Sequence, residues 1–137
     1  MDCVLCDVLK NEQDRIVYQD NLVFVVMNIE PLKPEHVIIL PVRHAEECSD
    51  LTPEEASVFL KMIDRTCQAV ASVSGATPTC VINGHAHRTQ PHLHAHVLPT
   101  SQGLRGLFAK AEGSPERKRL DSSELARLAA KLREVFE

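Results

Sequence analysis

The apolar residues of this chain form short β-branched runs in its first half and stripes at helical spacing later on. The segments Arg15–Gln19 and Asn21–Asn28 are β-branched and aromatic and are separated around Asp20, which predicts a hairpin. A proline-containing loop, Glu30–His36, leads into the apolar segment His36–Val42, which predicts a buried strand. The first half is therefore expected to be largely antiparallel sheet.

A helix is predicted between Thr52 and Gly75. Thr52 can cap it, Pro53 suits the first helical position, and Glu55 completes a capping box. Gly75 is a suitable stop signal. The apolar stripe, which should lie on a sheet, consists of Ala56, Phe59, Leu60, Ile63, Cys67 and Val70.

Two further strands are predicted, Thr79–Asn83 and His92–Pro99. The segment Thr100–Arg119 is punctuated by glycine and has no clear period, so a loop is expected there. A last helix should begin at Asp121, capped in concert with Glu124. Its apolar face consists of Leu125, Leu128, Ala129, Leu132, Val135 and Phe136.

The order of these elements points to an α+β fold with an antiparallel sheet, and 137 residues predict a single domain over residues 1–137. The composition is 44% hydrophobic and 25% charged with a net charge of -4, so neither nucleic acid nor a membrane is an expected partner. The apolar runs are far shorter than the roughly 20 residues of a membrane helix. The start of the chain lacks the features of a secretory signal, and five cysteines fit a reducing compartment, so a cytoplasmic location is expected.

Three histidines, His92, His94 and His96, alternate within the last predicted strand. Residues i and i+2 of a strand share a face, and burying three imidazoles without partners costs free energy, so the row indicates a functional site. The residues expected to face the core instead are Leu93, Ala95 and Val97. Two chemistries fit the row: a metal with an open coordination position for water, or catalysis by a neutral imidazole acting as nucleophile or base.

The Cys3–Cys6 pair has the C-x-x-C spacing that lets two thiolates bind one zinc ion, although a redox pair or chance would produce the same spacing. A closed zinc site needs two more ligands. His44, which follows a buried strand, and His92 would complete a tetrahedral set. Four protein ligands leave no open position, so this zinc would be structural and the other two histidines of the row would be available for chemistry.

The stretch "HLHAHVL" resembles the His-φ-His-φ-His-φ-φ signature of the histidine triad (HIT) family, where φ is apolar. The segment "VVMNIEPLKPEHVIILPVRH" is similar to that family's N-terminal half, and with "CVLC" and "VING" the resemblance runs from Cys3 to Pro99. It implies a five-stranded antiparallel sheet with two main helices, paired into a homodimer. Enzymes of the family are nucleotide hydrolases or transferases that attack an α-phosphate through a nucleotidyl-histidine intermediate.

The resemblance also implies roles for individual residues. His94 would be the nucleophile, and His96 would contact phosphate or assist the leaving group. His92 matches a ligand of structural Zn2+ in members that also carry C-x-x-C and a histidine at the position of His44. Nucleotide contacts would come from Asn28 at the ribose, and from Asn83, Arg88, Thr89 and His96. An apolar wall against the base would consist of Phe24, Val26 and Ile29.

Several of these residues have plainer interpretations. Asn28 can simply end a strand, Arg88 can belong to a solvated loop, and His36 is expected to be a structural hydrogen-bonding residue. Cys48, Cys67 and Cys80 are expected to act as small apolar residues.

The resemblance has departures: "AHRT" stands where the family has A-G-Q before a Ser or Thr, and Thr100 stands where an Arg is common. The implied function is a hydrolase that releases a nucleoside monophosphate from a nucleoside phosphoramidate or a dinucleoside polyphosphate. The alternatives are a nucleotidyltransferase, a non-catalytic nucleotide-binding module, and a hydrolase whose metal is held by the histidine row.

Overall fold

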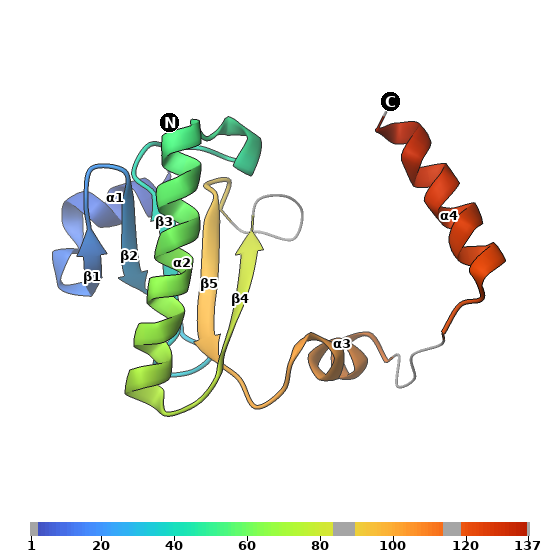
Figure 1. The fold of residues 1–137 in the computed structure, drawn as a ribbon. Helices are drawn as coiled ribbons and strands as arrows, with labels where there is room; N and C mark the ends of the chain where they lie inside the picture. The colour runs from blue at the N-terminus through green and yellow to red at the C-terminus, as the bar shows by residue number, and fades with distance from the viewer. Residues whose placement is uncertain (1–2, 84–89, 114–118, 137) are drawn as a thin grey trace. The chain divides into compact units, whose positions relative to one another are not determined.

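A computed structural model describes residues 3–83, 90–113 and 119–136 of the chain (Figure 1). The chain divides into two compact units, Met1–Ser101 and Gln102–Glu137. Among the described residues, the first unit has a sheet and two α-helices, and the second has two further helices. In these described ranges, none of the helices is both long and apolar enough to cross a membrane.

The sheet has five strands in the order β1-β2-β3-β5-β4, and every neighbouring pair is antiparallel. The strands are β1 (Ile16–Gln19), β2 (Val23–Met27), β3 (Val37–Pro41), β4 (Pro78–Asn83) and β5 (His94–Pro99). The turn of the β1–β2 hairpin forms at Asp20, whose Oδ1 accepts hydrogen bonds from the backbone N–H groups of Leu22 and Val23. The predicted fold class and hairpin are confirmed.

The two faces of the sheet have different covers. On one face, Val25, Ile39 and Ala95 are cross-strand neighbours and pack against α2 together with Phe59 and Val70. Leu93 and Val97 are fully buried in the same cluster, as the alternation of the histidine row predicted. The histidines that alternate with them on β5 must therefore lie on the opposite face.

Helix α2 (Pro53–Ser74) packs along the first face (Figure 1). The capping box is confirmed, since the Thr52 hydroxyl accepts from the Glu55 N–H and the Glu55 carboxylate accepts from the Thr52 N–H. Gly75 ends the helix with a φ of 71°. The predicted stripe is wrong for Leu60, which is 59% exposed. The buried face instead comprises Glu55, Phe59, Met62, Thr66 and Val70, and its polar members shift it from the stripe that apolar residues alone suggest.

Helix α1 (Val4–Asn11) covers part of the second face, and the sequence analysis did not anticipate it. Its Val8 packs in a cluster with Phe24, Val26, Ile38 and Leu40 of the neighbouring strands. The helix has only eight residues, too few to present a clear helical period. Two short 3-10 helices complete the first unit, η1 (Gln13–Arg15) and η2 (Cys48–Asp50).

The second unit corrects one expectation and confirms another. Helix α3 (Leu104–Glu112) forms where a loop was predicted. Gly103 and Gly113 flank this helix as its caps, so the glycines that suggested a loop mark its ends. Helix α4 (Ser122–Val135) begins as predicted, with the Asp121 carboxylate accepting from the Glu124 N–H.

Candidate active site and metal site

Strand β5 presents His94 and His96 on the sheet face opposite α2. Asn83 of β4 is the cross-strand neighbour of His94. The register of β4 and β5 therefore brings a predicted phosphate contact beside the predicted nucleophile. The prediction that His92 belongs to the same strand is wrong, since β5 begins at His94. The backbone N–H of Leu93 bonds to the Ala45 carbonyl, outside the ladder.

The hydrogen bond at Nδ1 fixes the tautomer of His94. Its Nδ1 lies 2.7 Å from the backbone carbonyl oxygen of His92. A carbonyl can only accept, so the proton of the neutral ring is on Nδ1 and the lone pair is on Nε2. The side-chain amide of Asn83 lies 3.4 Å from that Nε2 atom. In the neutral ring of His94, the nucleophilic nitrogen therefore faces Asn83.

His96 is oriented by His36, which directly precedes β3 and is only 2% exposed. The backbone N–H of Leu32 donates to Nδ1 of His36 at 3.1 Å, so the ring proton of His36 is on Nε2. That Nε2–H donates to Nδ1 of His96 at 2.8 Å. Nε2 of His96 must then carry a proton, which makes His96 a hydrogen-bond donor toward the site. His36 is a hydrogen-bonding residue as predicted, and its partner is a candidate catalytic side chain.

Asn83 lies between the two Nε2 atoms, 3.4 Å from that of His94 and 3.1 Å from that of His96. Nε2 of His94 carries a lone pair and Nε2 of His96 carries a proton. The first therefore needs the NH2 group of an amide, and the second needs the amide oxygen. Amide orientation is assigned from such networks. One atom of the Asn83 amide faces both rings. That atom can donate to His94 or accept from His96, but it cannot do both.

Burial keeps His96 and His36 neutral. Burial and, to a smaller extent, the neighbouring His94 and His36 lower the pKa of His96 to about 4. Burial also lowers the pKa of His36. Both imidazoles are therefore uncharged near pH 7, as the assigned tautomers require.

Asn28 follows β2, and its side-chain oxygen accepts from the Glu30 N–H at 2.9 Å, which forms an Asx turn. Its amide nitrogen is 3.5 Å from Nε2 of His36, so Asn28 both ends its strand and lies beside the histidine network. The predicted base wall is wrong for Phe24 and Val26, since both are fully buried among core residues. Ile29 is 69% exposed. Arg88 and Thr89 lie outside the described residues.

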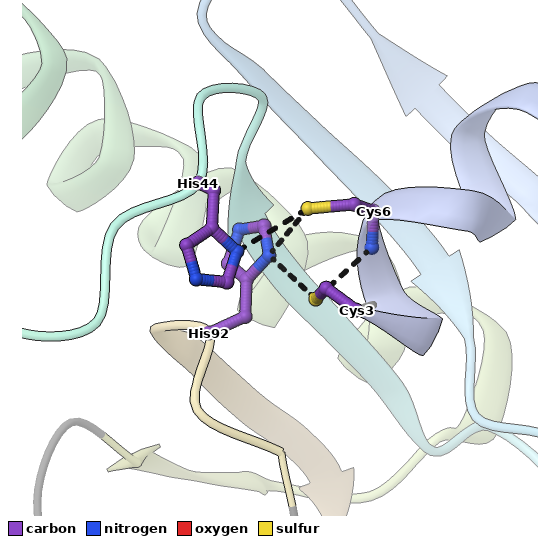
Figure 2. A group of neighbouring side chains, drawn as sticks. All are labelled: Cys3, Cys6, His44 and His92. Carbon is purple, nitrogen blue, oxygen red and sulfur yellow. Dashed lines mark hydrogen bonds between the residues drawn. The ribbon is translucent and has the colours of Figure 1, made fainter. Parts of the chain in front are cut away.

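A separate cluster joins the other predicted ligands (Figure 2). Cys3 precedes α1 as its N-cap and Cys6 lies in the first turn, so both sulfurs lie on the same side of that helix. The Sγ of Cys6 is 3.3 Å from Nδ1 of both His44 and His92, and the Sγ of Cys3 is 3.5 Å from Nδ1 of His92. All four ligand atoms lie within 4.8 Å of one another.

The donor set fits a tetrahedral zinc ion. Zn–S and Zn–N bonds of ordinary length place sulfur and nitrogen about 3.5 Å apart around a tetrahedron, close to the separations seen here. The Nε2–H of His92 donates a hydrogen bond to the Pro41 carbonyl at 3.0 Å, which leaves the Nδ1 lone pair turned toward the sulfurs. Burial and the adjacent Cys3 raise the pKa of the Cys6 thiol to about 11, and a bound cation would offset this. The four residues could therefore hold a metal ion with no open ligand position.

A cleft on the first unit lies away from these residues. Its volume is about 490 Å³, and its lining includes Val25 and Val37 of the sheet and Met62 and Val70 of α2. Because His96 pairs with Ile38, and neighbouring residues of a strand face opposite sides, this cleft is on the other face of the sheet.

Comparison with known proteins places the chain in a family. The sequence matches the HIT domain over residues 10–103. An uncharacterized HIT-like protein of Mycobacterium tuberculosis is 30% identical over 114 residues, which cover 80% of this chain and 79% of that protein. A bifunctional bis(5'-adenosyl)-triphosphatase/adenylylsulfatase of Arabidopsis thaliana is 28% identical over 69% of this chain and 54% of that protein. A Streptococcus mutans structure shares the fold, with a TM-score of 0.77, 20% identity, and coverage of 99% of this chain and 86% of that one. The chain belongs to the HIT family.

Proposed function

We propose that the chain is a nucleotide hydrolase that attacks the α-phosphate of a nucleoside phosphoramidate or a dinucleoside polyphosphate and releases a nucleoside monophosphate. The observation that supports this most directly is the 2.7 Å contact between Nδ1 of His94 and the His92 carbonyl, which leaves a lone pair on Nε2. The similarity to a plant dinucleoside triphosphatase supports the same substrate class.

The reaction would take two displacements. The Nε2 lone pair of His94 attacks the α-phosphorus, the bond from phosphorus to the leaving group breaks, and its electron pair departs with that group. The Nε2–H of His96 and the Asn83 amide are near enough to stabilise charge on the phosphate oxygens. Water then attacks the phosphorus, the bond to His94 breaks, and the electron pair returns to Nε2. The water proton leaves with the product or to solvent.

The test is the mass of the intact protein during turnover of an adenosine phosphoramidate and, separately, of diadenosine triphosphate. The wild type should gain one adenylyl group, and His94→Ala should gain none and lose turnover by at least about a thousandfold. Cys48→Ala, a change at an exposed cysteine remote from the row in sequence, serves as the control. Unchanged turnover in folded His94→Ala would refute the proposal.

The same experiment separates the alternatives. A nucleotidyltransferase would form the adduct and pass its nucleotide to an added phosphorylated acceptor, which yields an exchanged product that hydrolysis cannot give. A non-catalytic binding module would bind adenosine monophosphate and show neither adduct nor turnover.

We also propose that the cluster of Cys3, Cys6, His44 and His92 binds structural Zn2+. The two-sulfur, two-nitrogen donor set and the His92–Pro41 bond support this assignment. A metal held instead by the histidine row is less consistent with the geometry, because His92 turns its Nδ1 toward the two cysteine sulfurs and the assigned tautomer of His96 has a proton on Nε2. A chelator that stops turnover at once, without any loss of stability, would favour the histidine row.

We propose, in addition, that two copies pair through β4. This strand is at the edge of the sheet, and its Val81 and Ile82 are 48% and 43% exposed. An unpaired edge with apolar side chains is suited to strand addition by a second copy. Light scattering should give a dimer for the wild type and a monomer for Ile82→Lys, and a monomeric wild type would reject the pairing.

A further inference from the structure

One peptide group connects the metal-site cluster to the candidate nucleophile. This is the group between His92 and Leu93. Its carbonyl oxygen lies 2.7 Å from Nδ1 of His94, and its N–H donates to the Ala45 carbonyl at 2.7 Å. His92 and Leu93 are both fully buried and Ala45 is 2% exposed, so water does not compete for these bonds.

Both sides of this peptide group are held by residues of the cluster. On one side, the ring of His92 contacts both cysteine sulfurs, at 3.5 and 3.3 Å. On the other side, Ala45 directly follows His44, whose Nδ1 is 3.3 Å from the Sγ of Cys6. Figure 2 shows the two imidazoles converging on the sulfurs from separate segments of the chain. If the four ligands close around one ion, they fix His92, which carries the carbonyl of the peptide group. They also fix the segment of His44 and Ala45, which accepts the bond from its N–H.

We propose that the cluster positions the nucleophile, with His92 and His44 acting as positioning residues for His94. Holding the 92–93 peptide group fixes the carbonyl that selects the Nδ1–H tautomer of His94 and keeps the Nε2 lone pair directed at the site. The bonds to Ala45 and His94 run through one amide, so each polarises the other. When the cluster opens, the carbonyl loses its fixed direction, and the tautomer with the proton on Nε2, which cannot attack phosphorus, becomes populated.

The consequence for rate rests on the proposed function, but the coupling itself concerns only the state of the His94 ring. The primary measurement is therefore the 15N spectrum of the His94 ring in the zinc-loaded wild type, His44→Ala and His44→Cys. The wild type and His44→Cys, which keeps four ligands, should show Nδ1–H. His44→Ala should lose zinc and show a mixture of tautomers. In the same samples, adduct formation should fall by about tenfold or more in His44→Ala and be largely restored in His44→Cys.

Val70→Ala is the matched control, because it removes buried packing on the α2 face without touching the cluster. It should lower stability and leave the His94 tautomer unchanged. If His44→Ala does not fold, zinc is withdrawn stepwise from the wild type with a chelator, and the His94 signals should change with zinc loss before the α2-face methyl signals lose native dispersion.

A folded, zinc-free protein that retains a pure Nδ1–H tautomer would overturn the inference, as would His94 signals that change only on global unfolding. These outcomes are independent of turnover. A wild type that forms no nucleotidyl adduct would instead reject the proposed hydrolase and leave the tautomer result standing.

Discussion

Nε2 of His36 lies 2.8 Å from Nδ1 of His96, although sixty positions separate the two residues in the chain. Ile38 pairs with His96 across β3 and β5, and His36, two residues before Ile38, therefore belongs to the same face. The contact connects the loop after β2 to the candidate active site, because the Leu32 N–H fixes the tautomer of His36 and His36 fixes that of His96. The chain of bonds ends in an N–H directed at Asn83.

Replacing His36 should disturb His96 without altering the nucleophile. His36→Leu removes the donor to Nδ1 of His96, so both tautomers of His96 become populated and its contribution to phosphate binding weakens. We expect kcat/KM to fall by about tenfold, or ~1.4 kcal/mol. His36→Gln can still donate from its amide and should recover part of the loss. Steady-state kinetics and the 15N signals of His96 check this, and an unchanged His96 tautomer in His36→Leu would contradict it.

The neutral His96 predicts a loss of stability in mild acid. Its pKa is about 4 in the folded chain and ordinarily 6.5, so the unfolded chain binds more protons between these values. The stabilisation is complete above pH 6.5 and is lost as the pH falls toward 4, by up to about 3 kcal/mol. Urea unfolding at pH 7 and pH 5 should show a smaller pH effect in His96→Asn than in the wild type. Equal effects in both proteins would show that His96 is not the group responsible.

Removing one ligand of the cluster should cost both metal and stability. Cys3→Ser replaces a buried sulfur ligand and should lower the zinc content well below one ion per chain. With free zinc at 100 times its dissociation constant, the wild type gains about 2.7 kcal/mol from binding, and the variant should lose most of this. Cys80→Ser is the control, since Cys80 packs beside the α2 cluster instead. Elemental analysis and thermal unfolding give the answer, and a stable wild type without zinc would disprove the assignment.

Glu55 should stabilise the start of α2 through two separate contacts. Its carboxylate accepts from the Thr52 N–H at 2.9 Å and pairs with Arg43 at 2.8 Å, and it is 7% exposed. The bond from Arg43 is the main reason its pKa is lowered to about 2. The stabilisation from the ionised form is complete above pH 4.5 and is lost as the pH falls toward 2. Glu55→Ala should reduce the free energy of unfolding by about 1 to 3 kcal/mol.

Glu55→Gln separates the two contacts. It keeps a capping side chain at the third helical position while removing the charge that pairs with Arg43. It should therefore lose less stability at pH 7 than Glu55→Ala and show a weaker pH dependence below 4.5. Denaturant titrations of the three proteins decide this, and identical losses in both variants would mean that the cap contributes nothing.

Local chemistry explains where the sequence analysis succeeded. The turn at Asp20, the capping box of Thr52 and Glu55, and the cap at Asp121 all depend on residues within a few positions of one another. The alternation of His94 and His96 with apolar neighbours likewise follows from strand geometry alone. The four residues predicted as metal ligands do lie together in the structure, and residue type and the C-x-x-C spacing are the features of the sequence that suggested them.

Other features depended on contacts that no local pattern contains. Phe24 and Val26 are predicted to face a base, but α1 packs over their face of the sheet. Which segment covers a sheet face depends on a part of the chain outside the strands themselves. The glycines around α3 favour a loop when only the sequence is considered, but in the structure they cap the helix. The sequence around His36 does not indicate its partner. The contact with His96 depends on the pairing of β3 with β5, which are far apart in the sequence.

The sequence by itself determined the HIT signature, the antiparallel sheet, the main caps and the residue types of the two candidate sites, because all of these follow from side-chain chemistry and short-range periodicity. Only the tertiary structure decided which tautomers the histidines adopt and which side chains share a site. The reason is that a neutral imidazole takes its proton position from its hydrogen-bond partners, and here those partners are a backbone carbonyl, a second histidine and an asparagine that folding brings together.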